Sequence, residues 1–370
     1  MLSQTMMMMK RPPHRPIGAK VDSDPRQEQN VDASQKPSVS ETSQPNAADS
    51  SHSANPGMIP IRTGYFNASD GTRLFYSTEG RGHPLVFVYG LVCSSLHWTY
   101  QIDHFRKGYQ TVWFDYRGHN HSEIPKDLST LTVDQMSDDL NDLLKNLQLK
   151  KAIFLGHSMG VNVLLDFARK FPKKVHGLVL ANGTPRRPFE TIFNTNLTEL
   201  AFSGFEKAMN TLPKVVSTLW KAQKSSFLLK RLVGLGGFNI HLSSPKDVDL
   251  YVEKVADMDP RVFVQLVKNY RDYDATAWLD QIHAPSLILS GAEDLITPPA
   301  QQALMHQLLP KSQLERIPHG SHCSQMDLPE LINFKLQSFF DRLNWRFSDI
   351  SAEPTVATPS KNSQSKDGDA

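Results

Sequence analysis

A serine in a glycine-rich turn is the residue of this chain whose surroundings most clearly suggest chemistry. The segment Gly156–Gly160 reads Gly-His-Ser-Met-Gly, and it lies between an apolar run at 152–155 and a helix predicted over 159–171. Between a strand and a helix this pattern is typical of a tight turn, in which the serine backbone is strained and the residues two positions away must be small. The turn exposes the Ser158 hydroxyl at a helix N-terminus, where developing negative charge is favoured. We therefore predict that Ser158 is a nucleophile.

A serine hydroxyl needs a base, and the base needs a carboxylate that orients it. Asp294 comes in a loop after the apolar run 286–290, and His322 comes in a loop before a helix predicted over 329–343. The order Ser, Asp, His is the one expected for a serine in such a turn. His319 is the alternative base. Taken singly, Asp294 is more commonly a turn or cap residue and His322 more commonly an ordinary loop histidine.

Alternating strand and helix signals position these residues. Strands are predicted at 73–78, 85–89, 111–114, 152–155, 175–181 and 286–290, and helices at 133–147, 159–171 and 329–343. Such alternation predicts an α/β fold, with a mostly parallel sheet covered by helices on both faces. Ligands of such sheets bind at the carboxyl ends of the strands.

The remaining segments predict the domain organisation. Residues 186–275 carry helical signals without a strand pair, and we expect them to form a helical cap over the carboxyl edge of a core made of 59–185 and 276–347. Residues 1–58 and 348–370 contain no aromatic residue. Segments of this composition cannot bury enough apolar surface to offset their ordering entropy, so we predict disordered N-terminal and C-terminal tails.

Over roughly residues 62–343 the chain resembles the α/β-hydrolase family, and especially its capped serine esterase and lipase branch. Besides the serine turn, Asp115–Ser122 is similar to the family's D-x-R-G-x-G-x-S loop, with Asn120 in place of the second glycine. Asn is the next most willing residue at positive φ. The stretch His322–Glu330 is similar to the family's histidine followed by an acidic residue and a Pro-Glu helix start, which favours His322 over His319 as the base.

The family also implies an oxyanion hole, and here the sequence departs from the pattern. The family usually has His-Gly after the strand that precedes this loop, whereas this chain has Tyr89 and Gly90. The resemblance implies that the backbone N–H groups of Leu91 and Met159 hold the oxyanion. Backbone donors survive a side-chain change, so Tyr89 need not disable the site. Whether its phenol replaces the usual imidazole is left open by the sequence.

The reaction that the resemblance implies is hydrolysis of a carboxylic ester with a hydrophobic acyl or alcohol part, through a Ser158–His322–Asp294 triad and an acyl-enzyme. It needs no cofactor, and no metal site is expected. Thioesterase, carbon–carbon bond hydrolase, peptidase and cofactor-free perhydrolase activities use nearly the same residues, and the fold does not choose among them. A catalytically silent ligand-binding receptor is the alternative of another class. Serine instead of aspartate in the turn argues against epoxide hydrolases and haloalkane dehalogenases.

The net charge and the composition limit the partners and the compartment that we expect for this protein. The net charge is only +2 among 370 residues, which argues against a nucleic-acid partner. Two cysteines, Cys93 and Cys323, make no disulfide framework; buried thiols or a redox pair remain open. The chain has no apolar run long enough to span a membrane and no signal-peptide pattern, so cytoplasm is the default expectation.

A basic stretch in the predicted cap is the one feature that suggests a surface partner. Seven cationic residues and no acidic one lie between Lys207 and Lys246, interspersed with leucines and aromatics. They are Lys207, Lys214, Lys221, Lys224, Lys230, Arg231 and Lys246. Such a stretch could contact a membrane surface or an anionic substrate, or it could be the solvated face of a cap helix. The sequence does not give the oligomeric state.

Overall fold

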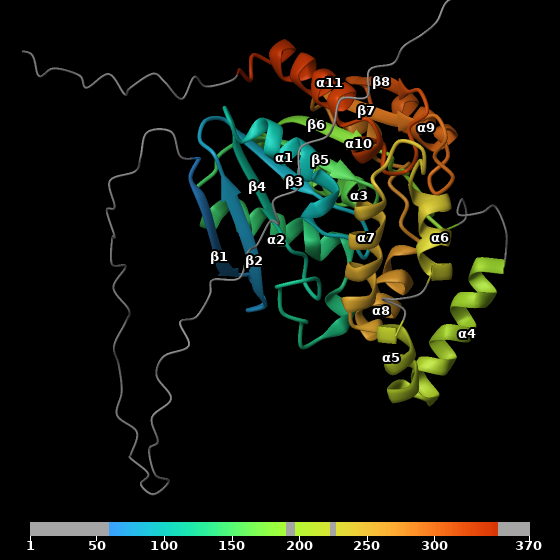
Figure 1. Ribbon diagram of the computed structural model, residues 1–370. Coiled ribbons are helices and arrows are strands. Elements are labelled where there is room, and N and C mark those ends of the chain that lie inside the picture. Colours follow the sequence, from blue (N-terminus) through green and yellow to red (C-terminus); the bar gives the residue numbers. More distant parts are fainter. Residues whose placement is uncertain (1–58, 190–196, 223–226, 347–370) are drawn as a thin grey trace, which may run out of the picture. The chain divides into compact units, whose positions relative to one another are not determined.

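An eight-stranded sheet is the centre of the structure, a computed structural model that describes residues 59–189, 197–222 and 227–346. The strand order is β1-β2-β4-β3-β5-β6-β7-β8, and the ribbon is drawn in Figure 1. The strands are β1 Ile61–Asn67, β2 Arg73–Glu79, β3 Pro84–Val88, β4 Gln110–Phe114, β5 Ala152–His157, β6 Val175–Ala181, β7 Ser286–Gly291 and β8 Ser312–Ile317. Strands β3 to β8 pair in parallel, and β2 runs antiparallel to both of its neighbours, β1 and β4, so the predicted mostly parallel sheet is confirmed.

Helices cover both faces of this sheet. They are α1 Thr99–Phe105, α2 Val133–Asn146, α3 Met159–Lys170, α9 Pro299–Leu308, α10 Ser324–Asp327 and α11 Pro329–Arg342. Helices α1 and α11 pack together on one face through Phe105 and Phe340, whose ring centroids are 5.2 Å apart, and α2 and α3 lie on the other face (Figure 1). The rings of Phe154 in β5 and Phe167 in α3 lie 4.9 Å apart and join the second layer to the sheet. The core is therefore two apolar interfaces, one on each side of the sheet.

The two strands that the sequence did not predict lie at the edges of the sheet. Strand β1 exposes five of its seven residues, and in β8 only Ile317 is buried. Because an edge strand buries few side chains, it carries neither the continuous apolar run nor the clean alternation that marks a central strand.

The region 186–275, called the cap below, contains in its described parts the helices α4 Leu197–Thr211, α5 Pro213–Ala222, α6 Phe227–Gly237, α7 Pro245–Asp257 and α8 Pro260–Tyr270. Its two ends meet, because Arg186 and Asp274 form an isolated bridge and Ala275 N–H donates to the Pro185 carbonyl at 2.9 Å. The cap and the sheet belong to one compact unit. The tails predicted at 1–58 and 348–370 lie outside the described residues.

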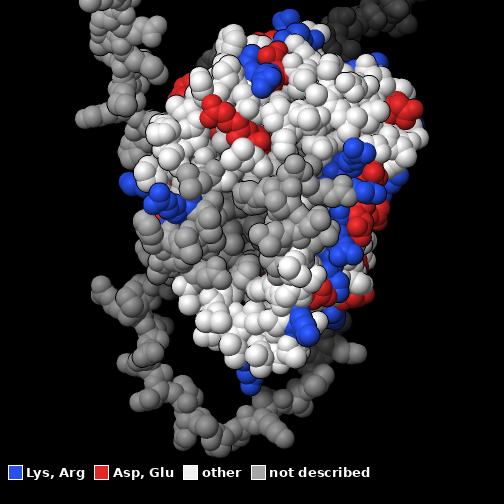
Figure 2. Space-filling view, turned by 90° about the vertical axis from the view of Figure 1, so that its right-hand side faces the viewer, with Lys and Arg blue, Asp and Glu red and all other residues white. Residues whose placement is uncertain are grey.

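Helix α5 presents apolar and basic side chains to solvent. It has no buried residue, and the exposed fractions of Val215 and Leu219 are 52% and 61%. Lys214 and Lys221 of the same helix are exposed as well. In Figure 2 the lower part of the described surface, over α4 and α5, is largely uncharged, with basic side chains at its lower edge and both basic and acidic ones along its right-hand border. Among the described helices, none is both long and apolar enough to cross a bilayer.

Candidate active site

Ser158 sits at the sharp turn between β5 and α3, and its backbone is strained. All six residues of β5 are buried, and the chain then reverses at Ser158 with φ 55° and ψ −122° before α3 begins. A Cβ at Gly156 would lie 2.8 Å from the Gly160 carbonyl oxygen, and a Cβ at Gly160 would lie 2.7 Å from the Tyr89 carbonyl oxygen. The two glycines are therefore required by close backbone approach, as the sequence pattern predicted. A left-handed conformation in a non-glycine residue is costly and persists only where the surroundings impose it.

His322 and Asp294 meet at the carboxyl edge of the sheet. The Nδ1 atom of His322 lies 3.0 Å from Oδ2 and 3.2 Å from Oδ1 of Asp294. The Asp294 side chain is fully buried, and 10% of the His322 side chain is exposed. The backbone N–H groups of Ile296 and Thr297 both donate to Asp294 Oδ1 at 2.9 Å, which fixes the carboxylate. The contact makes Nδ1 the donor nitrogen of His322, so Nε2 is its free acceptor while the ring is neutral.

Asn182, directly after β6, ties the acid loop to the histidine loop. Its Oδ1 accepts from Gly291 N–H at 2.8 Å, and its Nδ2 lies 2.8 Å from the His322 carbonyl oxygen. The hydroxyl of Thr297 lies 2.8 Å from the Asn182 carbonyl oxygen, and also 2.8 Å from Asp294 Oδ2. Sequence reasoning missed both residues; their only signal was a polar side chain just past a buried strand or beside the acid.

Two further polar groups hold the histidine loop. The Nε2 atom of His157 lies 2.8 Å from the His322 carbonyl oxygen. The buried carboxylate of Asp327 accepts from Ser321 N–H at 2.7 Å and from Asn239 N–H, in the cap, at 3.1 Å. Burial raises the pKa of Asp327. Sequence analysis gave His157 no role beyond its place in the serine turn and gave Asp327 only a place in a family motif. The structure places both residues against the loop that carries His322.

The loop after β3 comes within contact of Ser158. A Cβ at Gly90 would lie 2.9 Å from Ser158 Cβ and 3.3 Å from Ser158 Oγ. Among the described residues, the backbone N–H groups of Leu91 and Met159 have no hydrogen-bond acceptor. Val92 has φ 51°, a genuine outlier for a β-branched residue. Backbone N–H groups without an acceptor are the type of donor that stabilises an anion.

The phenol of Tyr89 organises the loop 115–122. Tyr89 is fully buried; its O–H donates to Asp115 Oδ1 at 3.0 Å and its oxygen accepts from Tyr116 N–H at 3.1 Å. Asn120 adopts φ 45°, as its place in the loop pattern predicted. The phenol thus links the end of β3 to the neighbouring loop.

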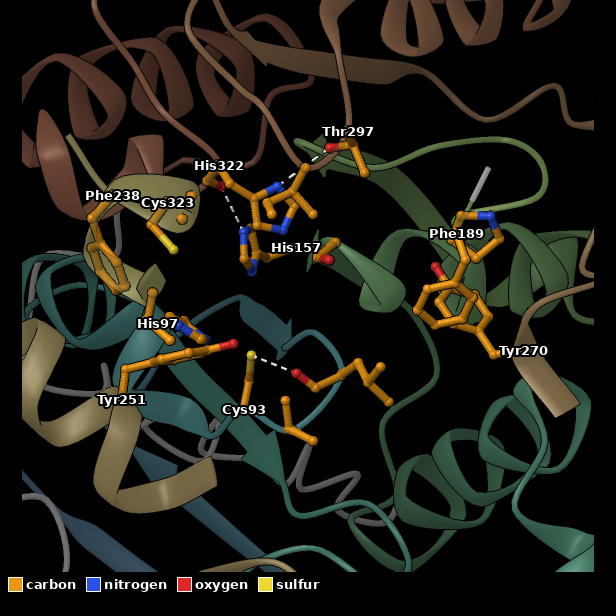
Figure 3. A pocket seen from close by; sticks show the side chains of 18 residues that line it. Cys93, His97, His157, Phe189, Phe238, Tyr251, Tyr270, Thr297, His322 and Cys323 are labelled. Carbon is orange, nitrogen blue, oxygen red and sulfur yellow. Dashed lines mark hydrogen bonds between the residues drawn. The ribbon is translucent and has the colours of Figure 1, made fainter. Parts of the chain in front are cut away.

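A cavity of about 330 Å³ lies between the sheet edge and the cap. Its lining comprises Leu91, Val92, Cys93, His97, His157, Ser158, Pro188, Phe189, Val233, Gly236, Gly237, Phe238, Tyr251, Tyr270, Ile296, Thr297, His322 and Cys323. Figure 3 looks into it, with Phe189 and Tyr270 on one side and His97, Tyr251 and Phe238 on the other. No Lys, Arg, Asp or Glu belongs to this lining as described. The cavity therefore suits a neutral, mainly apolar ligand.

Of the predicted residues, the nucleophile and one of the two candidate bases line the same cavity. Ser158 and His322 both line it, although no hydrogen bond joins their side chains in the described structure. The alternative base His319 is not among the lining residues; its side chain is 77% exposed and pairs with Glu293 at 2.9 Å. The structure thus brings His322, and not His319, to the cavity that contains Ser158.

The two cysteines are free, buried thiols on the cavity wall. Cys93 and Cys323 both line the cavity, and burial raises the pKa of each. The Cys93 thiol donates to the Leu91 carbonyl oxygen at 3.0 Å, so this side chain supports the loop beside Ser158. His119, in the loop 115–122, contacts the Arg117 carbonyl oxygen at 3.2 Å. In the ranges that the structure covers, no group of acidic, histidine or cysteine side chains is arranged to hold a metal ion.

Comparisons with known proteins identify the family. The profile described as the alpha/beta hydrolase fold matches residues 83–329, most of the chain. The chain therefore belongs to the α/β-hydrolase fold family, and the predicted resemblance is confirmed.

Individual relatives support a hydrolase activity. Epoxide hydrolase 3 of Mus musculus is 34% identical over 119 residues, 32% of each chain. This match thus spans about a third of the mouse protein. Epoxide hydrolase 3 of Xenopus tropicalis is 25% identical over 288 residues, 75% of this chain and 77% of that protein. The structure of an esterase from Rhodococcus sp. has a TM-score of 0.62 and 22% identity, and the match covers 76% of this chain and 99% of that one. At this identity it supports the fold alone.

Proposed function

We propose that this protein is a serine hydrolase that cleaves neutral carboxylic esters. The observation that carries the proposal is the contact of His322 Nδ1 with the buried carboxylate of Asp294, at the edge of the cavity that also contains Ser158. A carboxylate that holds one nitrogen of an imidazole orients the ring and stabilises its protonated form. The other nitrogen is then a base for a serine hydroxyl.

The proposed reaction proceeds in two halves. Ser158 Oγ attacks the ester carbonyl while His322 Nε2 takes its proton, and the oxyanion accepts hydrogen bonds from Leu91 N–H and Met159 N–H. His322 returns the proton to the leaving alcohol, which departs and leaves an acyl-serine. Water then attacks the acyl group with His322 as its base, and release of the acid restores the serine. In apo structures the serine–histidine contact is often long, so its absence here is compatible with this route.

The nucleophile decides between carbonyl chemistry and the epoxide chemistry named in two of the relatives. Attack of Ser158 Oγ on an epoxide carbon would join enzyme and substrate by an ether, which has no carbonyl for water to attack. Attack on an ester leaves an acyl-serine, which the same base and anion site can hydrolyse. A serine at this position therefore favours esters.

A serine-directed phosphonate tests the proposal. The wild-type protein is expected to form a covalent adduct and Ser158→Ala is expected to form none, with labelling slowed at least about 100-fold in Asp294→Asn. Ser203→Ala, a serine outside the cavity lining, serves as the matched control and should label like wild type. Labelling that is absent from wild type, or equal in wild type and Ser158→Ala, would contradict the proposal and favour a ligand-binding receptor.

A substrate panel then separates the activities that share this machinery. Esters, thioesters and amides with matched acyl groups should be hydrolysed in the order esters above amides, and all turnover should disappear in Ser158→Ala. Hydrolysis of amides or thioesters without esters would refute the ester assignment while leaving the serine mechanism intact.

A further inference from the structure

His97 is a buried imidazole on the cavity wall that the proposed reaction does not use. It belongs to a short 3-10 helix, Ser95–Trp98, that follows the loop beside Ser158. Only 3% of the residue is exposed, it lines the cavity, and neither ring nitrogen has a hydrogen-bond partner among the described residues. Its ring lies 5.1 Å from that of Tyr251 and 5.2 Å from that of His157, centroid to centroid (Figure 3). Buried polar groups are nearly always satisfied, so two unpartnered nitrogens on a side chain that lines a cavity point to a ligand.

The neighbouring imidazole of His157 offers a complementary atom. Its Nε2 contacts the His322 carbonyl oxygen, which can only accept, so Nε2 carries the proton. In the neutral ring Nδ1 is then an acceptor, and no described residue donates to it. Burial lowers the pKa of His97 to about 3 and holds that of His157 well below its usual range, with the nearby His322 as the second cause for both. Both rings are therefore neutral near neutral pH.

A hydroxyl group matches this pair of rings. A neutral His97 has one N–H to donate and one nitrogen that accepts, and His157 adds a second acceptor. A hydroxyl accepts one hydrogen bond and donates another, whereas a carbonyl could use only the N–H. A carboxylate or an ammonium group would be buried without a charged partner, which is costly. The facing wall at Phe189 and Tyr270, whose rings are 5.8 Å apart, suits the apolar part of the same molecule.

We propose that His97 and His157 form a hydrogen-bonding subsite for a hydroxyl group of the substrate, which is therefore a neutral, hydroxylated ester. This proposal rests on the proposed function for the role of Ser158. His97 is a specificity residue here: it binds a group away from the ester bond and takes no part in bond breaking. His157 serves both the subsite and the loop that carries His322.

Kinetics on matched esters test the subsite. Alkyl esters with a hydroxyl at successive carbons of the acyl chain are compared with the unsubstituted ester of equal length. For wild type, kcat/KM for at least one hydroxylated ester is expected to be at least about 10-fold higher than for the unsubstituted ester. A purely apolar cavity would instead disfavour the hydroxylated ester. In His97→Phe the ratio of the two kcat/KM values should fall to about one, because the ring remains but its hydrogen bonds do not. The matched control His104→Phe changes an exposed histidine of α1 and should keep the wild-type ratio.

A binding measurement keeps the two proposals separable. Ser158→Ala is titrated by calorimetry with a hydroxylated methyl ketone and with its plain analogue, which need no turnover. The hydroxylated ketone should bind about 10-fold more tightly, and adding His97→Phe should remove the difference. Equal affinity for the two ketones, or a preference that survives His97→Phe, would overturn the subsite. If wild type hydrolyses esters without a preference for the hydroxylated ones, the subsite is refuted and the proposed serine hydrolase function stands. If the phosphonate does not label the protein but the hydroxylated ketone still binds more tightly, the hydrolase function is refuted and the subsite stands.

Discussion

Gly90→Ala tests whether the loop after β3 and the serine turn are held at a fixed distance. The added Cβ would lie 2.9 Å from Ser158 Cβ, whereas ordinary van der Waals contact begins at 3.4 Å. The loop and the turn must then separate by about half an ångström or more. The backbone of Gly90 does not have positive φ, so the substitution itself introduces no conformational strain.

This displacement should weaken catalysis much more than folding. It moves Leu91 N–H away from an oxyanion formed at Ser158, and loss of one such donor costs roughly 2.7–4 kcal/mol of transition-state stabilisation. We expect kcat for an ester substrate to fall about 100-fold or more, with a thermal midpoint lowered by only a few degrees. The assay combines initial-rate kinetics, phosphonate labelling and thermal unfolding of the same preparation.

Gly204→Ala is the matched control. A Cβ at Gly204, in the cap helix α4, would meet no atom within 4 Å, so activity should not change and stability should rise slightly. A folded Gly90→Ala protein with wild-type kcat and labelling rate would refute the proposed position of the oxyanion site.

Three further predictions concern stability and surface. Because burial lowers the pKa of His97 to about 3, the unfolded state takes up a proton that the folded state excludes as the pH falls below about 6.5. The free energy of unfolding, measured with denaturant, should therefore fall between pH 6 and pH 4. In His97→Phe this dependence on pH should be shallower by about 1.4 kcal/mol per pH unit, and an unchanged dependence would contradict the burial argument. Tyr89→Phe removes the phenol donor of Asp115 Oδ1 and leaves the buried Tyr116 N–H without its acceptor, so it should lower the free energy of unfolding by about 1–3 kcal/mol, whereas a loss under about 0.5 kcal/mol would show that the phenol does not organise the loop. We also propose that α5 contacts anionic membranes. The protein should cosediment with anionic vesicles in a salt-sensitive manner, and the double variant Lys214→Glu, Leu219→Glu should not cosediment. Binding that is absent, or that does not depend on salt, would refute this proposal.

The edge strands β1 and β8 and the role of Tyr89 could not be predicted from the sequence. Most central strands were predictable because they bury a continuous apolar run, and β1 and β8 were not because few of their side chains are buried. The role of Tyr89 was open because its partner Asp115 lies on another loop, and only the pairing of β3 beside β4 brings the two together.

By itself the sequence determined the local geometry around Ser158 and the kind of fold that surrounds it. A strand, a tight glycine turn and a helix follow each other within a few residues, so the pattern and its physical cause are both local. Only the tertiary structure shows that Asn182 joins two loops and that His157 supports the His322 loop. It also shows that His97 lines the cavity with neither ring nitrogen bonded to a described residue. These are contacts between residues far apart in the chain, and their strength depends on burial and on distance, neither of which residue spacing encodes.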